Sequence, residues 1–167
     1  MTQAEQMVTI HSQGSTFEAY LARPAGEGPF PAVVVIHEIY GLNDNIKDIA
    51  RRFATAGYVA LAVDLFAGRN RTVCMMRFMS QMIFTPLKNA SLENLKDALT
   101  FLTGQAGVDA ERLGAIGFCL GGGFSIAWAC NDNRLKAIAP YYGVNPRPLT
   151  AVARACPVVG SYPDKDF

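Results

Sequence analysis

Short apolar runs recur along the chain, and their composition predicts the strands of a parallel sheet. The runs are rich in β-branched and small side chains and lack polar alternation, which is typical of strands buried on both faces. They occupy residues 31–37, 59–63, 112–118, 135–139 and 157–160. Before them, residues 7–11 and 17–22 alternate in part around a Ser-Gln-Gly-Ser turn, which predicts an antiparallel hairpin.

Between these runs, apolar positions recur every three or four residues, which predicts amphipathic helices. The expected helices cover residues 45–56 with Asn45 as cap, 72–84, 91–103 beginning at Ser91, 124–130 and, as a short turn, 148–154. Strands that alternate with helices predict an α/β fold, a three-layer αβα sandwich with a mostly parallel central sheet. No linker interrupts the pattern, so residues 1–167 are expected to form a single domain.

The helix expected at residues 72–84 differs from the others because its apolar side chains lie on more than one side. It carries Met75, Met76, Met79 and Met82, and it is therefore predicted to form a cap or a pocket wall. Arginines at positions 69, 71 and 77 lie before or within it, where they could bind a carboxylate-bearing substrate. Solvated surface arginines are an equally good interpretation.

Composition narrows the class of protein. Half of the residues are hydrophobic and the net charge is +1, so no basic surplus indicates a nucleic-acid partner. No apolar run reaches the roughly 18 residues of a membrane helix, and the polar N-terminus does not resemble a signal peptide. The four cysteines form no CxxC pair, which favours free thiols in a cytoplasmic protein over a disulfide scaffold or a zinc ribbon.

The sharpest motif is Gly117-Phe118-Cys119-Leu120-Gly121, between an expected strand and an expected helix. It matches the G-x-S-x-G nucleophile elbow with Cys in place of Ser. A tight strand-to-helix turn leaves no room for side chains two positions to either side of the nucleophile. It also places Cys119 at a helix N-terminus, where the dipole favours a thiolate, and aims the N–H of Leu120 at an oxyanion. A buried structural cysteine or a phosphate-binding turn is the alternative.

Two further motifs follow other strands. His37-Glu38-Ile39-Tyr40-Gly41 succeeds the first buried run, where a loop can supply the second oxyanion donor, the N–H of Ile39. A zinc-binding HExxH helix is disfavoured because the second histidine is absent. Tyr162-Pro163-Asp164-Lys165-Asp166 succeeds the last run, where this fold places its acid, although a solvated surface turn fits equally well.

Taken together, the motifs resemble the dienelactone hydrolase family, an α/β-hydrolase family, over nearly the whole chain. The matching segments are His37 to Gly41, Gly57-Tyr58, Asp64 to Phe66, Gly117 to Gly122, Tyr141 to Gly143 and Pro157 to Asp166. The resemblance implies Cys119 as nucleophile, Asp166 rather than Asp164 as the acid, and Glu38 as a partner of the resting thiol. It also implies that Tyr40 lies beside the substrate, that no metal or organic cofactor is used, and that lactones or carboxylic esters are cleaved.

The sequence departs from the family at its catalytic histidine, which in the family follows the acid. Here Phe167 alone follows Asp166, and the only histidines are His11, expected at the surface, and His37, expected to face away from Glu38. We therefore expect a C-terminally incomplete form that lacks the family's last strand, its histidine and its closing helix. The segment ending at Gly160 would then be an exposed sheet edge, which predicts a dimer through that edge.

The sequence thus predicts a hydrolase of lactone or ester bonds that works through a Cys119 thioester on a small-molecule substrate. Two other classes remain open. One is a catalytically inactive α/β-hydrolase-like binding module, which the missing histidine favours. The other is a nucleotide-binding doubly wound domain, which is disfavoured because the chain has no phosphate-loop motif.

Overall fold

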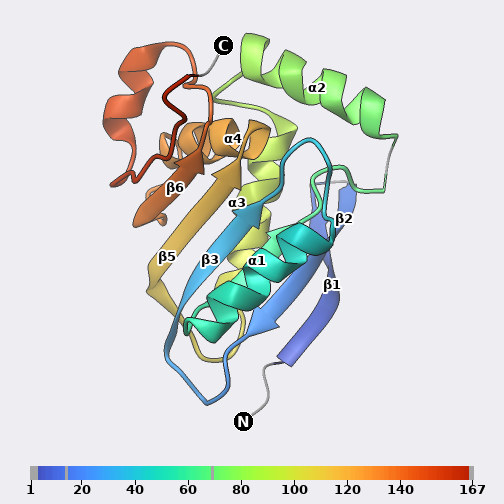
Figure 1. Cartoon of the computed structure of the whole chain (residues 1–167), viewed down its shortest axis with the longest axis vertical. Coiled ribbons are helices and arrows are strands. Elements are labelled where there is room, and N and C mark those ends of the chain that lie inside the picture. Colours follow the sequence, from blue (N-terminus) through green and yellow to red (C-terminus); the bar gives the residue numbers. More distant parts are fainter. Residues whose placement is uncertain (1–3, 14, 69, 166–167) are drawn as a thin grey trace.

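A computed structural model describes residues 4–13, 15–68 and 70–165. One six-stranded sheet runs through the molecule in the order β1-β2-β4-β3-β5-β6 (Figure 1). The strands are β1 (Ala4–Ser12), β2 (Ser15–Arg23), β3 (Phe30–Ile36), β4 (Val59–Val63), β5 (Val108–Phe118) and β6 (Ala137–Tyr141). The helices are α1 (Asp44–Thr55), α2 (Arg71–Phe84), α3 (Ala90–Thr103), α4 (Leu120–Ala129) and a 3-10 turn, η1 (Leu149–Arg154).

The sheet is mixed, as the apolar pattern predicts. β1 and β2 form the antiparallel hairpin, and β2 joins β4 in antiparallel register, with Leu21 opposite Leu61. From β4 onward the pairs β4-β3, β3-β5 and β5-β6 are all parallel. The carboxyl ends of β3, β4, β5 and β6 therefore meet at one edge of the sheet, where open α/β sheets bind their ligands.

Helices cover both faces of the sheet, which confirms the α/β sandwich. α1 packs its buried Ile46, Ala50 and Ala54 against one face. α3 and α4 cover the other face, where the apolar stripe of α3 and the fully buried Trp128 of α4 form the larger core. Residues of β3 alternate between these two cores, and this is why its sequence is apolar at every position.

Several expected boundaries are wrong by a few residues, for local reasons. The cap of α1 is Asn43 rather than Asn45, because the Asn43 side chain accepts the N–H of Ile46 at 3.0 Å. The cap of α3 is Asn89 rather than Ser91, which is buried inside the helix. α4 begins at Leu120 rather than Phe124, because the helix starts directly after Cys119 and absorbs three glycines.

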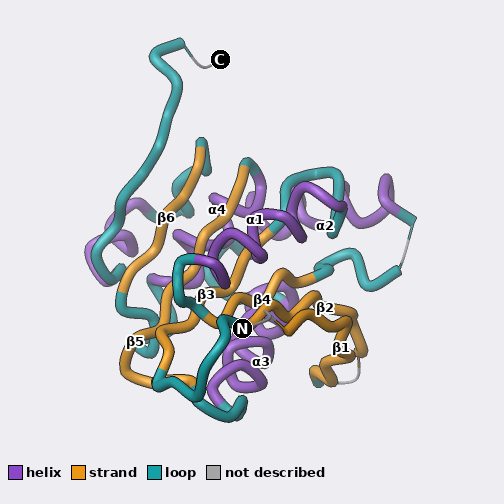
Figure 2. Tube along the Cα trace, turned by 60° about the horizontal axis from the view of Figure 1, so that its bottom comes forward, coloured by secondary structure: helices purple, strands orange, loops and turns teal. Residues whose placement is uncertain are grey.

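The last expected strand, residues 157–160, is reduced to isolated parallel bridges that join Val158 to Ile138 and Ser161 to Tyr141. The preceding strand is also displaced from 135–139 to β6 at 137–141. The segment runs beside β6 at the edge of the sheet (Figure 2), with Val158 44% and Val159 75% exposed. Among the described residues, no helix is long and apolar enough to cross a membrane.

Candidate active site

Cys119 lies at a strained turn between β5 and α4. Its backbone has φ 55° and ψ −114°, a conformation that side-chain-bearing residues rarely adopt. The turn is held because the Cys119 N–H donates to the carbonyl oxygen of Tyr141 at 3.0 Å. The thiol is partly exposed, and α4 begins at the next residue, Leu120.

The glycines on either side of Cys119 are required by close backbone contacts. A Cβ atom on Gly117 would lie 2.1 Å from the carbonyl oxygen of Gly121. A Cβ atom on Gly121 would lie 2.6 Å from the carbonyl oxygens of both Ile36 and His37. These contacts are too short for any side chain, so the Gly-x-Cys-x-Gly spacing follows from the geometry of the turn.

A second loop packs against the elbow from the end of β6. A Cβ atom on Gly143 would lie 2.3 Å from the carbonyl carbon of Gly122, so the loop can approach α4 only with glycine at that position. The preceding residue, Tyr142, has φ 43° and is 40% exposed. The Tyr-Tyr-Gly segment thereby brings a phenol to the same edge of the sheet as Cys119.

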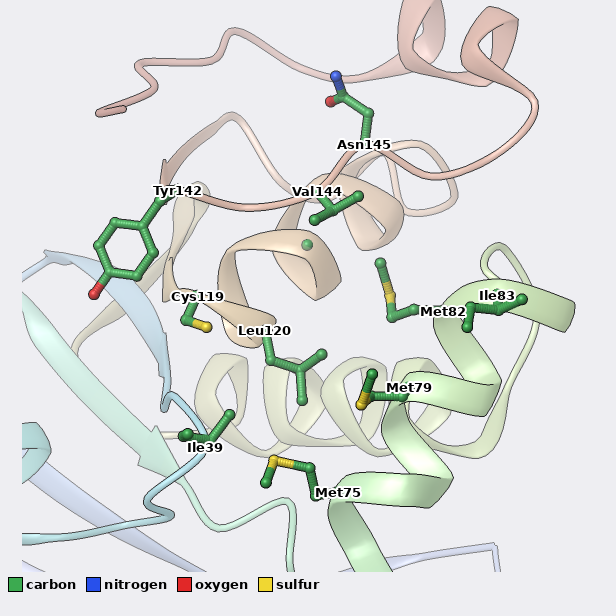
Figure 3. A pocket seen from close by; sticks show the side chains of 11 residues that line it. Ile39, Met75, Met79, Met82, Ile83, Cys119, Leu120, Tyr142, Val144 and Asn145 are labelled. Atoms are coloured by element: carbon green, nitrogen blue, oxygen red, sulfur yellow. The ribbon is translucent and has the colours of Figure 1, made fainter. Parts of the chain in front are cut away.

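A cavity of about 350 Å³ opens beside Cys119 (Figure 3). Cys119, Leu120 and Ile39 form one side of it, and the Tyr142 loop forms another. The third wall is α2, which contributes Met75, Met79, Met82 and Ile83 (Figure 3). The methionine-rich helix therefore is the pocket wall that its pattern predicts. A volume of this size falls within the range of small-molecule sites.

The electrostatics of the site link three side chains. Burial is the main cause that raises the pKa of Tyr142 above its usual 10.0, and the neighbouring charges of Glu38 and Cys119 raise it further. The phenol therefore stays protonated through the physiological range and can donate a hydrogen bond. Glu38 itself is partly buried in the turn after β3.

His37 is engaged elsewhere. It is 3% exposed, its Nε2 accepts the main-chain N–H of Leu65 at 3.1 Å, and its Nδ1 lies 2.5 Å from the carbonyl oxygen of Glu38. Burial lowers the pKa of His37, against smaller opposing effects of the Glu38 hydrogen bond and the Asp64 charge. His37 is thus a neutral structural residue, with both ring nitrogens used to fix the loop that carries Glu38.

The other expected site residues fall as follows. Ile39 and Leu120 share the cavity with Cys119, whereas Tyr40 is 56% exposed and outside its lining. Asp166 lies outside the described residues, and Asp164 is exposed. His11 is exposed on the hairpin, as expected. Among the described residues, no group of three His, Cys, Asp or Glu side chains could hold a metal ion.

Sequence reasoning missed Tyr142 and Asn145 as residues of the site. The glycine after Tyr142 was the available signal, because a loop that needs glycine for close approach to the elbow must also place its neighbour there. Asn145 gave no such signal. Cys156 is partly exposed, whereas Cys74 and Cys130 are buried, and all four thiols are free.

The mixed sheet with a cysteine at a strained strand-to-helix elbow defines the class as an α/β-hydrolase fold. Comparison with known proteins makes this specific, since the model of the dienelactone hydrolase family matches residues 17–167. The chain belongs to the dienelactone hydrolase family.

Individual relatives agree with the family. A Methylorubrum extorquens protein named "Putative carboxymethylenebutenolidase" is 34% identical over 95% of this chain, and a Saccharolobus solfataricus protein of the same name is 34% identical over 97%. The chain spans 59% and 76% of their respective lengths. A solved dienelactone hydrolase-like promiscuous phosphotriesterase from metagenomic libraries superposes with a TM-score of 0.85 at 27% identity, covering 98% of this chain and 70% of that one.

Proposed function

We propose that this chain cleaves carboxylic ester or lactone bonds through a thioester on Cys119. The observation that carries the proposal is the strained elbow, which presents a thiol to a cavity of substrate size. Backbone strain of this kind is costly and persists where a function requires it. Membership in the dienelactone hydrolase family and the names of the relatives support the same reaction class.

In the acylation step, the Cys119 sulfur attacks the carbonyl carbon, and Glu38 accepts the thiol proton. A C–S bond forms while the carbonyl π electrons move to oxygen. The N–H groups of Ile39 and Leu120 are proposed to stabilise that oxyanion, since both residues line the cavity and Leu120 begins a helix. Collapse of the intermediate breaks the C–O bond, and Glu38 returns its proton to the departing alkoxide.

Hydrolysis of the thioester requires a base for water, and neither histidine of this sequence is suited to that role. His37 uses both ring nitrogens for structural hydrogen bonds, and His11 lies on the hairpin. Asp166 as the acid of a triad stays a prediction. We therefore propose that this sequence carries the acylation machinery and assign the deacylation base to none of its histidines.

The proposed substrate is a small molecule, and no cofactor takes part in the steps above. A net charge of +1 gives no electrostatic reason to propose a nucleic-acid or membrane partner. Tyr40 is proposed to contact substrate, because it directly follows Ile39, which lines the cavity, and is 56% exposed. Four free thiols support the proposal of a cytoplasmic location, because disulfides are rare in that compartment.

The release of p-nitrophenol from p-nitrophenyl acetate by the chain, by Cys119→Ala and by Cys156→Ala tests the proposal. Cys156 is the matched control because it is the other partly exposed thiol. We expect p-nitrophenol release to be lost in Cys119→Ala and retained in Cys156→Ala. Release that is equal in all three proteins would contradict a Cys119 nucleophile.

A catalytically inactive binding module is the second candidate, and the structural role of His37 favours it. Selective alkylation by iodoacetamide separates the two, because a binding module has no need of a reactive thiol. An activated nucleophile should react much faster than Cys156, whereas a binding module should show no preference between these two accessible thiols.

A second copy of this chain is the proposed partner at the sheet edge. Residues 157, 159 and 161 provide the hydrogen bonds to β6. Strand geometry directs the backbone groups of Val158 and Gly160 away from β6. Val158 and Val159 are both substantially exposed. Edges of this kind pair with other chains.

A further inference from the structure

The pocket wall formed by α2 is anchored to the core, so the same side of the helix stays turned toward the cavity. Phe78, on the inner side of α2, is 1% exposed, stacks on Phe66 with ring centroids 5.5 Å apart, and meets Phe124 of α4 edge-on at 5.4 Å. Cys74, one turn earlier, is also buried. These contacts fix one side of the helix against the core and leave another side toward the cavity.

The side of α2 that faces the cavity is a methionine stripe. Met75, Met79 and Met82 recur at helical spacing and point toward the elbow (Figure 3). The wall approaches closely, because a Cβ atom on Gly123 of α4 would lie 2.9 Å from Cε of Met82. Methionine side chains are unbranched and polarisable, so such a wall adapts to chains of different shape.

Charge is distributed unfavourably for an anionic substrate. None of the described residues that line the cavity is charged, and its polar side chains are Cys119, Tyr142 and Asn145. The carboxylate of Glu38 is one cause of the raised pKa of Tyr142, which lines the cavity, so the charge on this side of the site is negative. Arg77 lies on α2 outside the lining, whereas residue 69 and the side chain of residue 71 lie outside the described part of the chain.

We infer that the site accepts an uncharged, apolar acyl chain, seated against the methionine stripe, in preference to a carboxylate-bearing substrate. This inference rests on the proposed function, since it names the substrate class of the same site. Burial of one methylene is worth about 0.8 kcal/mol, so each carbon that reaches the stripe should accelerate the reaction by about two- to fourfold.

The test measures the rate at which N-methyl, N-butyl and N-hexyl iodoacetamide alkylate Cys119. Each rate is divided by the rate of the same reagent with glutathione, and peptide mass mapping locates the modified residue. The corrected rate should rise with chain length, and a hexyl analogue that ends in a carboxylate should react at least tenfold more slowly than N-hexyl. Met79→Ser should flatten the dependence. Met76→Ser is the matched control, because Met76 is 64% and Met79 55% exposed on the same helix, and Met76 does not line the cavity.

Rates that are independent of chain length, or faster with the carboxylate, would overturn the inference. The same series as p-nitrophenyl esters, from acetate to octanoate, separates this outcome from failure of the proposed function. Alkylation that depends on chain length, without ester cleavage, would support the apolar site and contradict the proposed hydrolase function. Ester cleavage that does not depend on acyl length would support the hydrolase function and contradict the acyl site.

Discussion

The carbonyl oxygen of Gly121 lies 2.1 Å from the position that a Cβ atom would take on Gly117. The two glycines therefore form a single steric unit that allows β5 to turn into α4 within three residues. Cys119 sits between them with a positive φ, held by its hydrogen bond to Tyr141. The reactivity that we propose depends on this contact.

Gly117→Ala is expected to destroy the elbow, because neither the methyl group nor the backbone of α4 can move away. We expect a loss of more than about 3 kcal/mol in the free energy of unfolding, together with loss of Cys119 acylation. Chemical denaturation followed by circular dichroism measures the first effect. Gly104→Ala is the control, since it has φ −77° and its nearest contact would be 3.5 Å, and it should change stability by less than about 0.5 kcal/mol. Similar stability of the two variants would show that the turn is not constrained.

The sequence predicts the sheet, the elbow and the hairpin because each depends on local features that a single chain records. Apolar runs identify the buried strands, and glycines on both sides of Cys119 identify the turn. Two helices begin earlier than expected, because Asn43 and Asn89 cap them and several residues that can cap lie close together there. The sequence does not predict the place of Tyr142 in the cavity or the structural role of His37, because both depend on contacts between segments that are distant in sequence.

His37 makes stability sensitive to acid. Its pKa in the fold is lower than the usual 6.5, so the unfolded chain takes up the proton first as pH falls. The stabilising contribution is therefore complete above pH 6.5 and is lost as pH falls from there toward the lower folded-state pKa. We expect a slope of up to about 1.4 kcal/mol per pH unit in the free energy of unfolding.

Urea unfolding between pH 7.5 and 5 measures this slope. His37→Gln should be less stable by about 1–3 kcal/mol at pH 7.5, because it disturbs the bonds to Leu65 and Glu38, and should lose the slope. His11→Gln, on the exposed hairpin, is the control and should keep both values. A slope that survives in His37→Gln would assign the acid sensitivity to other groups.

Glu38 and Tyr142 should be coupled in titration. The Glu38 carboxylate is one cause of the raised Tyr142 pKa, so Glu38→Gln should lower that pKa toward 10.0. Ultraviolet difference titration against Tyr142→Phe isolates this phenol from the other tyrosines. The same Glu38→Gln variant should slow acylation of Cys119 by about 10²–10⁴-fold if the carboxylate takes the thiol proton. If the pKa of Tyr142 is unchanged in Glu38→Gln, the Glu38 carboxylate does not act on the site, and its proposed role as acceptor of the thiol proton is contradicted.

The exposed edge at residues 157–161 should mediate self-association. Val159 is 75% exposed there, and a lysine in its place should oppose pairing of two such edges. Sedimentation equilibrium should show a concentration-dependent dimer that Val159→Lys weakens. Val73→Lys, at a site on α2 that is 60% exposed and distant from the edge, should leave the equilibrium unchanged. A chain that stays monomeric at all concentrations would contradict the dimer.

The most direct test of the central claim is the mass of the protein a few seconds after mixing with p-nitrophenyl butyrate and quenching in acid. The account predicts one added butyryl group per chain, located by peptide mapping on Cys119, sensitive to hydroxylamine as a thioester is, and absent from Cys119→Ala. It also predicts a burst of p-nitrophenol equal to one equivalent of protein. An unmodified chain, or a butyryl group on any other residue, would contradict Cys119 as the nucleophile.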